Sequence, residues 1–272
     1  MNYTQLEETC KRIRRLTIDC IASRGLGHVG GSLSAVEALV ALYHGIMNID
    51  PSNPRKEGRD QFVLSKGHSG PALYAVLADR GYFDVKYLKT LNRPETILPS
   101  HCDRNRTPGI DMTTGSLGQG FSCAVGLAIG AKKKGDSAMI YAMLGDGELQ
   151  EGQIWEAAML AGNQKLDNLV AIVDWNKMQL DGTIDEVNGI TPLADKWKAF
   201  NWNVISVGEG NNVARVYEAL QAAKELQNQE PTVVLLETTK GKGVSFAEKA
   251  GVGCHNMPVT EEMRLQAMQE LS

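Results

Sequence analysis

Apolar and polar positions recur along the chain with two different periods, and each period predicts one kind of element. Residues 2–24 mix charged and apolar side chains at helical spacing, which predicts an amphipathic helix. From residue 118 onward, predicted helices alternate with short apolar runs such as AMIYAML and LVAIV. Such runs are typical of strands that are buried on both faces of a parallel sheet. The helices are expected at 118–134, 152–164 and 212–228, and the strands at 138–144, 169–174, 202–207 and 232–237.

The first hundred residues are predicted to add further helices and one short strand. Ser34-Ala-Val-Glu37 has the capping-box pattern and is expected to open an apolar helix over 35–46. Residues 49–60, rich in Pro, Asn, Gly and charge, are expected to form a loop. A strand at 61–64, a Gly-His-Ser-Gly turn and a helix at 71–80 follow. The repeated β-α-β units predict an α/β fold, a doubly wound and mostly parallel sheet with helices on both faces. With no repeat or linker, residues 1–272 are expected to form a single domain.

Composition narrows the possible functions. The chain has 28 Lys and Arg and 32 Asp and Glu residues, which gives a net charge of −4. It therefore lacks the surplus of basic residues that is typical of a nucleic-acid-binding protein. No apolar run approaches the ~20 residues of a membrane span, and the first residues lack the apolar core of a signal peptide. The five cysteines, an odd number without a C-x-x-C pair, indicate neither a zinc ribbon nor a complete disulfide framework. We therefore expect a cytoplasmic protein that binds neither nucleic acid nor a membrane.

Polar side chains follow two predicted strands at the carboxyl edge of the sheet, where ligands of such folds bind. Gly145-Asp146-Gly147 comes directly after one strand, and Asn176 follows the next. A carboxylate, an amide oxygen and free backbone carbonyls suit Mg²⁺ that keeps phosphate oxygens in its shell. The glycines allow the backbone to approach a diphosphate, and the helix after 151 points its N-terminus toward it. The sequence thus predicts a metal–diphosphate site; for the first motif alone, an ordinary strand-end turn is an equal alternative.

These motifs resemble the thiamine-diphosphate fingerprint, and the chain as a whole resembles the N-terminal part of a transketolase. The matching blocks run in the family's order over nearly the whole chain: Gly27-His-Val-Gly-Gly31, Ser65-Lys-Gly-His68, Thr113-Thr-Gly-Ser-Leu-Gly-Gln-Gly120, Gly145-Asp-Gly147, Asp174-Trp-Asn-Lys177 and Thr238-Thr-Lys-Gly-Lys-Gly243. Two departures are visible. Val29 stands where the family usually has Pro, and the block Cys254-His-Asn-Met257 differs from the family's His-Gly pair.

The resemblance implies a thiamine-diphosphate-binding fold in which residues 1–272 form the diphosphate-binding domain. A fused transketolase continues with a pyrimidine-binding domain and a C-terminal domain. Both are expected here on a partner chain, the C-terminal subunit of a split transketolase, in a two-plus-two heterotetramer. The family's cofactors are thiamine diphosphate and Mg²⁺, with Ca²⁺ or Mn²⁺ in its place. Because the glutamate that activates the cofactor lies on the pyrimidine-binding domain, we do not expect residues 1–272 to be active alone.

The resemblance also assigns roles to four of the five histidines. His28 and His101 match family histidines that hold the donor's hydroxyls near the cofactor. His68 matches one beside the diphosphate and substrate, and His255 one close to the thiazolium and diphosphate. A neutral imidazole can donate to a sugar hydroxyl or shuttle a proton near pH 7. His44, inside an apolar helix pattern, is assigned to structure.

The remaining matches concern the cofactor and the metal. Glu151 corresponds to a glutamate of the carboxylate network at the subunit boundary; an acid favoured by the helix dipole is the equal alternative. Lys240 corresponds to a lysine that offsets diphosphate charge; Lys242 competes for that role, and a solvated loop lysine is the alternative. The expected metal site comprises Asp146, Asn176 and Met178. The expected cofactor contacts are His68, Gly115, Ser116, Leu117, Gly145, Asp146, Gly147, Asn176, Lys240 and His255.

The function implied is transfer of a two-carbon ketol unit from a ketose, or ketose phosphate, to an aldose. A subunit of another thiamine-diphosphate enzyme, such as a 2-oxo-acid dehydrogenase or a deoxyxylulose-phosphate-synthase-like enzyme, is one alternative. A non-catalytic regulatory subunit is another. The histidine cluster favours sugar handling, and the intact Asp146 and Asn176 favour catalysis. The sequence does not name the donor or acceptor, because the family's sugar-phosphate contacts lie largely on the missing domains.

Overall fold

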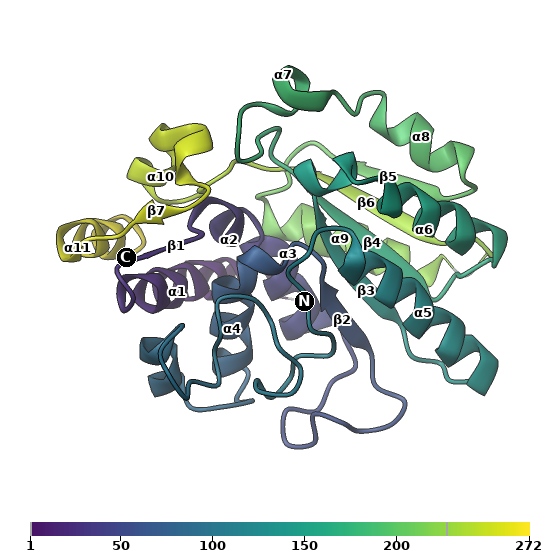
Figure 1. Cartoon of the computed structure of the whole chain (residues 1–272). Helices are drawn as coiled ribbons and strands as arrows, with labels where there is room; N and C mark the ends of the chain where they lie inside the picture. Colours follow the sequence, from purple (N-terminus) through teal and green to yellow (C-terminus); the bar gives the residue numbers. More distant parts are fainter. Residues whose placement is uncertain (1, 227) are drawn as a thin grey trace.

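The computed structural model describes residues 2–226 and 228–272, and at its centre lies a five-stranded parallel sheet of order β2-β3-β4-β6-β5 (Figure 1). The strands are β2 (Gln61–Leu64), β3 (Ile140–Gly145), β4 (Leu169–Trp175), β5 (Asn203–Val207) and β6 (Thr232–Glu237). Each lies within two residues of its predicted bounds. The predicted α/β fold with a parallel sheet is confirmed.

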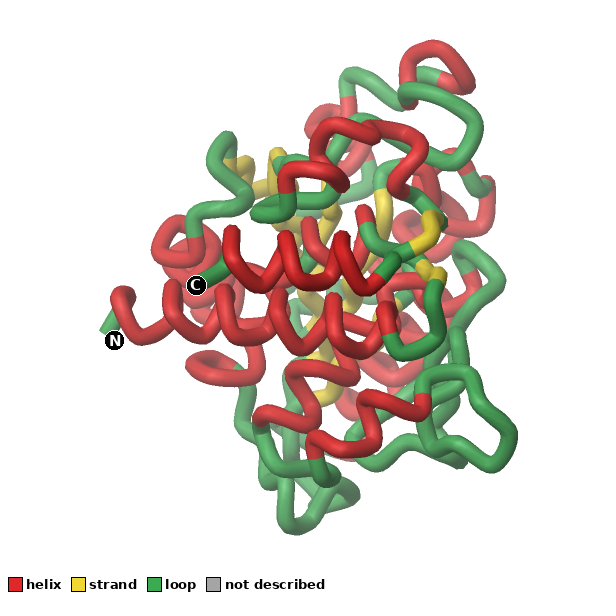
Figure 2. Tube along the Cα trace, turned by 90° about the vertical axis from the view of Figure 1, so that its left-hand side faces the viewer, coloured by secondary structure: helices red, strands yellow, loops and turns green. Residues whose placement is uncertain are grey.

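Helices cover both faces of this sheet. On one face lie α1 (Tyr3–Ala22), α2 (Gly30–Ser34), α3 (Val36–Ala41), a π-helical turn (Leu42–Ile46), α4 (Gly70–Asp79) and α9 (Val213–Glu225); on the other lie α5 (Gln119–Lys134), α6 (Gly152–Asn163) and α8 (Leu193–Ala199). The remaining helices are α7 (Ile184–Asn188), α10 (Ser245–Ala250) and α11 (Glu261–Glu270), with 3₁₀ turns at Gly67–Ser69, Val85–Thr90, Gly147–Gln150 and Gly251–Cys254. Figure 2 shows helices in front of and behind the strands.

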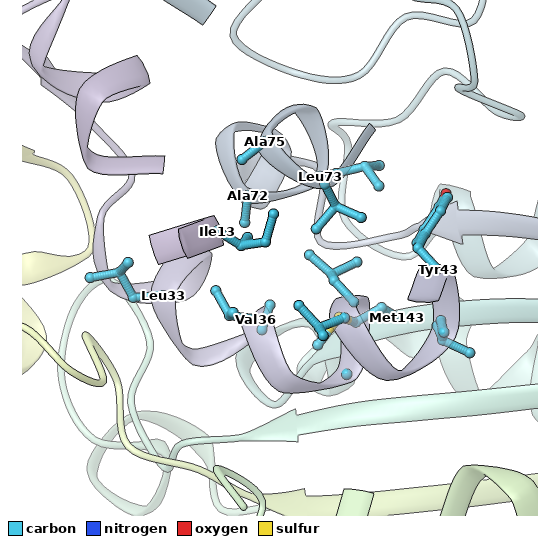
Figure 3. Close-up of a cluster of buried hydrophobic side chains, with 14 of the residues drawn as sticks. Ile13, Leu33, Val36, Tyr43, Ala72, Leu73, Ala75 and Met143 are labelled. Atoms are coloured by element: carbon cyan, nitrogen blue, oxygen red, sulfur yellow. The ribbon is translucent and has the colours of Figure 1, made fainter. Parts of the chain in front are cut away.

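The alternation of side chains along the strands explains why the strands read as continuous apolar runs. In β3, Tyr141 and Met143 enter the core under α3 and α4, whereas Ile140 and Ala142 enter the core under α5 and α6. Figure 3 shows the first of these cores, where Met143 lies near side chains of α3 and α4. Because both faces of the strand are buried, a polar residue has no place on either face until the strand ends.

Local signals fix several helix ends. The side chain of Asn2 accepts a hydrogen bond from the backbone N–H of Gln5 and caps α1. Gly118 and Gly135 bracket α5 with φ of +83° and +69°, a region that favours glycine. Position 227, within the predicted helix 212–228, lies outside the described residues.

Two expectations about local structure need correction. Ser34 does not open a capping box, because its hydroxyl donates to Asp174 (2.6 Å) while Glu37 pairs with Arg14 (2.7 Å). The chain is instead helical already at Gly30, within α2. A short antiparallel pair, β1 (Leu26–Gly27) with β7 (Met257–Pro258), was not predicted; it joins two segments that lie some 230 residues apart in the sequence.

The surface and the termini add two observations. Within the described residues, no helix is both long and apolar enough to cross a membrane. The last helix, α11, packs beside the first helix, α1.

Candidate active site

A cavity of about 310 Å³ opens at the carboxyl ends of the strands, and we call it the cofactor pocket. The residues that line it are His28, Gly31, Lys66, His68, His101, Gly115, Leu117, Gly145, Asp146, Gly147, Glu148, Asn176, Met178, Gln179, Leu180, Asp181, Lys240 and His255. Its size falls within the range of small-molecule sites. Of the expected site residues, Ser116 and Glu151 are absent from this lining, and both are exposed.

Asp146 and Asn176 meet at the edge of the sheet because β3 and β4 are in register, with Gly145 opposite Asp174. Asp146 is 2% exposed, and its carboxylate accepts hydrogen bonds from the backbone N–H groups of Gly147 (2.8 Å) and Lys177. Burial, followed by the nearby charge of Asp174, raises the pKa of Asp146 to about 7. A cation beside a buried carboxylate stabilises its charged form.

The four expected histidines converge on the pocket from four separate segments. The His28 ring centroid lies 5.4 Å from that of His68, 5.8 Å from that of His101 and 5.4 Å from that of His255; His68 and His255 are 4.9 Å apart. The β1–β7 pair helps to bring His28 and His255 together. Burial lowers the pKa of all four imidazoles, to about 4 for His28 and His255. The cluster is therefore neutral at pH 7 and offers uncharged hydrogen-bonding groups.

His44 lies apart from this cluster, in the π-helical turn, with its Nε2 atom 3.4 Å from the carboxylate of Asp79. It does not line the cofactor pocket. This position agrees with the structural role expected for it.

Lys240 and Lys242 lie in the same loop but differ in burial and in their contacts. Lys240 is 4% exposed, and its ammonium donates to the carbonyl of Met178 (3.1 Å) and lies 3.5 Å from Nδ1 of His255. Burial lowers its pKa. Lys242 is 42% exposed and lies 4.0 Å from Glu248. The loop thus presents Lys240, not Lys242, to the pocket.

Two further charged residues at the floor of the pocket were missed in the sequence. Lys66 is 1% exposed, and its ammonium donates to Asp174 and to the carbonyl of Gly31 (2.9 Å). Although burial alone would raise the pKa of Asp174, the charge and hydrogen bond of Lys66 hold it below its ordinary range. The sequence contained one indication that Lys66 is functional, because this residue belongs to the Ser-Lys-Gly-His block that matches the family.

Glu148 is the second missed residue. It is 2% exposed, and it accepts hydrogen bonds from Ser65 Oγ (2.5 Å) and from the backbone N–H groups of Gly118 (2.9 Å) and Gly145 (3.1 Å). One carboxylate therefore ties together the ends of β2 and β3 and the start of α5. Its neighbour in sequence, Glu151, precedes α6 and points to the surface instead.

The pocket fits a magnesium–diphosphate group. Asp146 offers a carboxylate and Asn176 an amide oxygen, the hard oxygens that Mg²⁺ prefers, whereas the carbonyl of Met178 accepts a hydrogen bond from Lys240 (3.1 Å) in this structure. No group of three or more His, Cys, Asp or Glu placed to hold a metal occurs among the residues the structure describes. A bound Mg²⁺ at this edge would therefore need oxygens from its ligand, which a diphosphate provides. Gly31 lets His68 approach closely, since a Cβ there would lie 3.0 Å from the imidazole Nε2.

Comparisons with known proteins identify the family of this chain. The family model described as "Transketolase, thiamine diphosphate binding domain" matches residues 6–271. The "6-deoxy-6-sulfo-D-fructose transketolase subunit SqwG" of Clostridium sp. (strain MSTE9) is 54% identical over 98% of this chain and 96% of its own length. An apulose-4-phosphate transketolase subunit of Actinobacillus succinogenes is 41% identical over 100% of this chain and 97% of its own length.

Solved structures lead to the same family. The transketolase of Campylobacter jejuni superposes on this chain with a TM-score of 0.91 and is 30% identical in sequence. The R525L mutant of the Pichia stipitis transketolase superposes with a TM-score of 0.90 and is 31% identical. This chain spans 43% and 41% of those two chains. With its matching sequence and fold, the chain belongs to the transketolase family and carries that family's thiamine-diphosphate-binding domain.

Proposed function

We propose that this chain is the diphosphate-binding subunit of a two-chain transketolase that transfers a two-carbon ketol unit from a ketose to an aldose. One observation carries the proposal: a single pocket joins Asp146 and Asn176 to a cluster of neutral histidines. The first two suit a metal-bound diphosphate, and the histidines suit a polyhydroxylated substrate. A 2-oxo-acid substrate would make no use of several hydroxyl-binding groups.

The individual roles follow from the positions in the pocket. Asp146, Asn176 and the carbonyl of Met178 would hold Mg²⁺, and Lys240 would offset charge on the diphosphate. The backbone of Gly115 and the side chain of Leu117 line the side of the pocket where the aminopyrimidine would enter. When bound, thiamine diphosphate supplies the electron sink that cleavage next to a carbonyl requires.

We propose that four histidines contact the substrate: His28, His68, His101 and His255. Their imidazoles are neutral, so each can donate one hydrogen bond and accept another from a sugar hydroxyl. Ser116 and Glu151, which do not line this pocket, are proposed to act only in the assembled enzyme: Ser116 through its backbone, and Glu151 at the subunit boundary.

The substrate is proposed to be a ketose that carries a phosphate or a sulfonate. The relatives at 54% and 41% identity are named for a sulfonated and a phosphorylated sugar. The four histidines of the cofactor pocket carry no fixed positive charge, so we expect the anionic end of the substrate to be held by the partner chain.

A C-terminal transketolase subunit is proposed as that partner, in a two-plus-two assembly. Relatives of nearly the same length are named as subunits, and complete transketolases are more than twice as long. Exposed apolar side chains on α6 support this partner: Met159 is 56% exposed and Leu160 is 45% exposed. They lie next to a groove of about 280 Å³ between α5 and α6. Large exposed apolar side chains beside a groove are typical of interfaces.

We further place the protein in the cytoplasm. All five cysteines are free thiols, and four of them are buried. Unpaired thiols of this kind are typical of a reducing compartment.

The test is a ketol-transfer assay on the purified chain, with and without a C-terminal transketolase subunit, in the presence of thiamine diphosphate and Mg²⁺. We expect turnover only when both chains are present, with phosphorylated or sulfonated ketoses as donors. Robust turnover by the lone chain would overturn the two-chain proposal. If the pair binds the cofactor tightly but transfers no ketol unit from any such donor, the proposed activity is wrong.

A further inference from the structure

A second cavity, which we call the arginine cavity, lies apart from the cofactor pocket. Its volume is about 490 Å³, and it is formed by residues 52–61 before and at the start of β2 together with residues 104–111. It shares no lining residue with the cofactor pocket. Four of the chain's twelve arginines line it, and no lysine does. These four are Arg55, Arg59, Arg104 and Arg106.

One of these arginines is already neutralised. Arg59 forms an ion pair with Asp111, the single carboxylate in the lining, and the two side chains are 14% and 4% exposed. Asp111 also accepts a hydrogen bond from the backbone N–H of Phe62 (2.9 Å), at the edge of β2. This pair therefore forms a fixed wall of the cavity, in which Asp111 accepts hydrogen bonds from Arg59 and Phe62.

The other three arginines leave a surplus of positive charge. Arg106 has only a loose contact, 3.7 Å from Asp103, with its side chain 57% exposed. Arg55 and Arg104 form no ion pair with any residue that the structure describes. In a chain with a net charge of −4, three such guanidinium groups around one cavity form a local positive field that attracts anions.

The rest of the lining indicates which anion fits. Ser52, Asn53, Gln61 and Asn105 contribute hydroxyl and amide groups. Planar guanidinium groups match the oxygens of a phosphate or sulfonate, and the neutral polar groups match hydroxyls. We propose that the arginine cavity binds a sugar phosphate or sugar sulfonate at a site separate from the cofactor pocket.

The arginine cavity is linked to the cofactor pocket through the backbone. The backbone N–H of Arg104 donates to Thr113 Oγ1 (3.1 Å), and that of Thr114 donates to the carbonyl of Cys102 (3.0 Å). These bonds join the segments that carry His101 and Gly115, both of which line the cofactor pocket. A ligand bound in the arginine cavity would therefore contact a segment that is hydrogen-bonded to the wall of the cofactor pocket.

The test uses calorimetric titration of the whole chain with fructose 6-phosphate, inorganic phosphate and fructose, in wild type and variants. We expect saturable binding of fructose 6-phosphate, weaker binding of inorganic phosphate and none of fructose. Because each charge-assisted contact is strong, Arg55→Ala with Arg104→Ala should weaken binding by at least about tenfold. Hydrogen exchange should slow in residues 104–111 when the ligand is bound.

Two controls locate the binding. Arg24→Ala removes an exposed arginine that forms no ion pair with any described residue, and it should leave the affinity unchanged. Lys240→Ala alters only the cofactor pocket and should also leave it unchanged. The proposal is overturned if no binding saturates by ~10 mM, or if Lys240→Ala abolishes binding while the arginine variant keeps it. Equal affinity for inorganic phosphate and fructose 6-phosphate would show an adventitious ion only, and would equally overturn it.

Discussion

Replacing Lys66 by Met tests whether the buried ion pair at the floor of the cofactor pocket holds the pocket together. The side chains of Lys66 and Asp174 are 1% and 0% exposed, so removal of the ammonium leaves a carboxylate without a counter-ion in the protein interior. Breaking a buried pair in this way costs about 3–5 kcal/mol. Asp174 keeps hydrogen bonds from Ser34 (2.6 Å), Thr238 and Asn176 (3.3 Å), which favours the lower end of that range.

The expected loss is therefore about 3 kcal/mol, which for 272 residues lowers Tm by about 5 °C. Urea unfolding followed by circular dichroism gives the free energy of unfolding directly. Lys242→Met is the matched control: the side chain is 42% exposed, so the change should stay within about 0.5 kcal/mol. The double variant Lys66→Met with Asp174→Asn removes both charges and should be more stable than the sum of the single losses predicts. A Lys66→Met loss below about 1 kcal/mol, or strict additivity in the double variant, would refute the reasoning.

Three further predictions concern the metal, the partner and pH. Asp146→Asn should weaken Mg²⁺-dependent binding of pyrophosphate by about tenfold or more with the fold intact, and an unchanged calorimetric affinity would remove Asp146 from the site. Met159→Glu should prevent co-purification with a C-terminal subunit, whereas Leu265→Glu, on α11 and similarly exposed (50%), should not; equal retention by both variants would place the interface elsewhere. Burial and the charge of Lys66 keep the pKa of His68 well below its ordinary range, so the folded chain leaves the imidazole neutral while the unfolded chain binds a proton below pH ~6.5. Below that pH, His68 should therefore lower the free energy of unfolding by about 1.4 kcal/mol for each unit by which the pH falls. The His68→Gln variant lacks this contribution, so its curve of unfolding free energy against pH should be flatter than that of wild type. A curve that runs parallel to that of wild type would contradict the prediction.

The strands and the site motifs were predictable because they depend on local pattern. A parallel strand covered on both faces has to be apolar along its whole length, as β3 and β4 are. Polar residues then appear where each strand ends, which is why the sequence alone predicts Asp146 and Asn176 side by side. The histidines could be gathered only through the family resemblance, since the segments of His28 and His255 are far apart in the sequence.

The missed features depend on contacts between distant segments. Ser34 has the sequence pattern of a helix cap, but Asp174 lies 140 residues away and takes its hydroxyl. By its sequence context, Lys66 is typical of a solvated turn lysine. In the folded chain it donates a hydrogen bond to the same Asp174, which lies 108 residues away in the sequence. Local propensity cannot register such partners, so the local pattern does not distinguish Lys66 and Glu148 from surface charges; for Lys66, only its place in the matching Ser-Lys-Gly-His block could have done so.

The charges at the floor of the cofactor pocket are the physical reason why we expect a metal to bind there. Asp146, Glu148 and Asp174 face two ammonium groups, those of Lys66 and Lys240, while the histidines are neutral. The floor thus has no surplus of positive charge to attract a diphosphate. Lys66 is paired with Asp174, and burial together with the charge of Asp174 raises the pKa of Asp146 to about 7. A divalent cation beside Asp146 relieves that carboxylate and supplies the missing charge for the diphosphate, so metal and diphosphate are expected to bind as one unit.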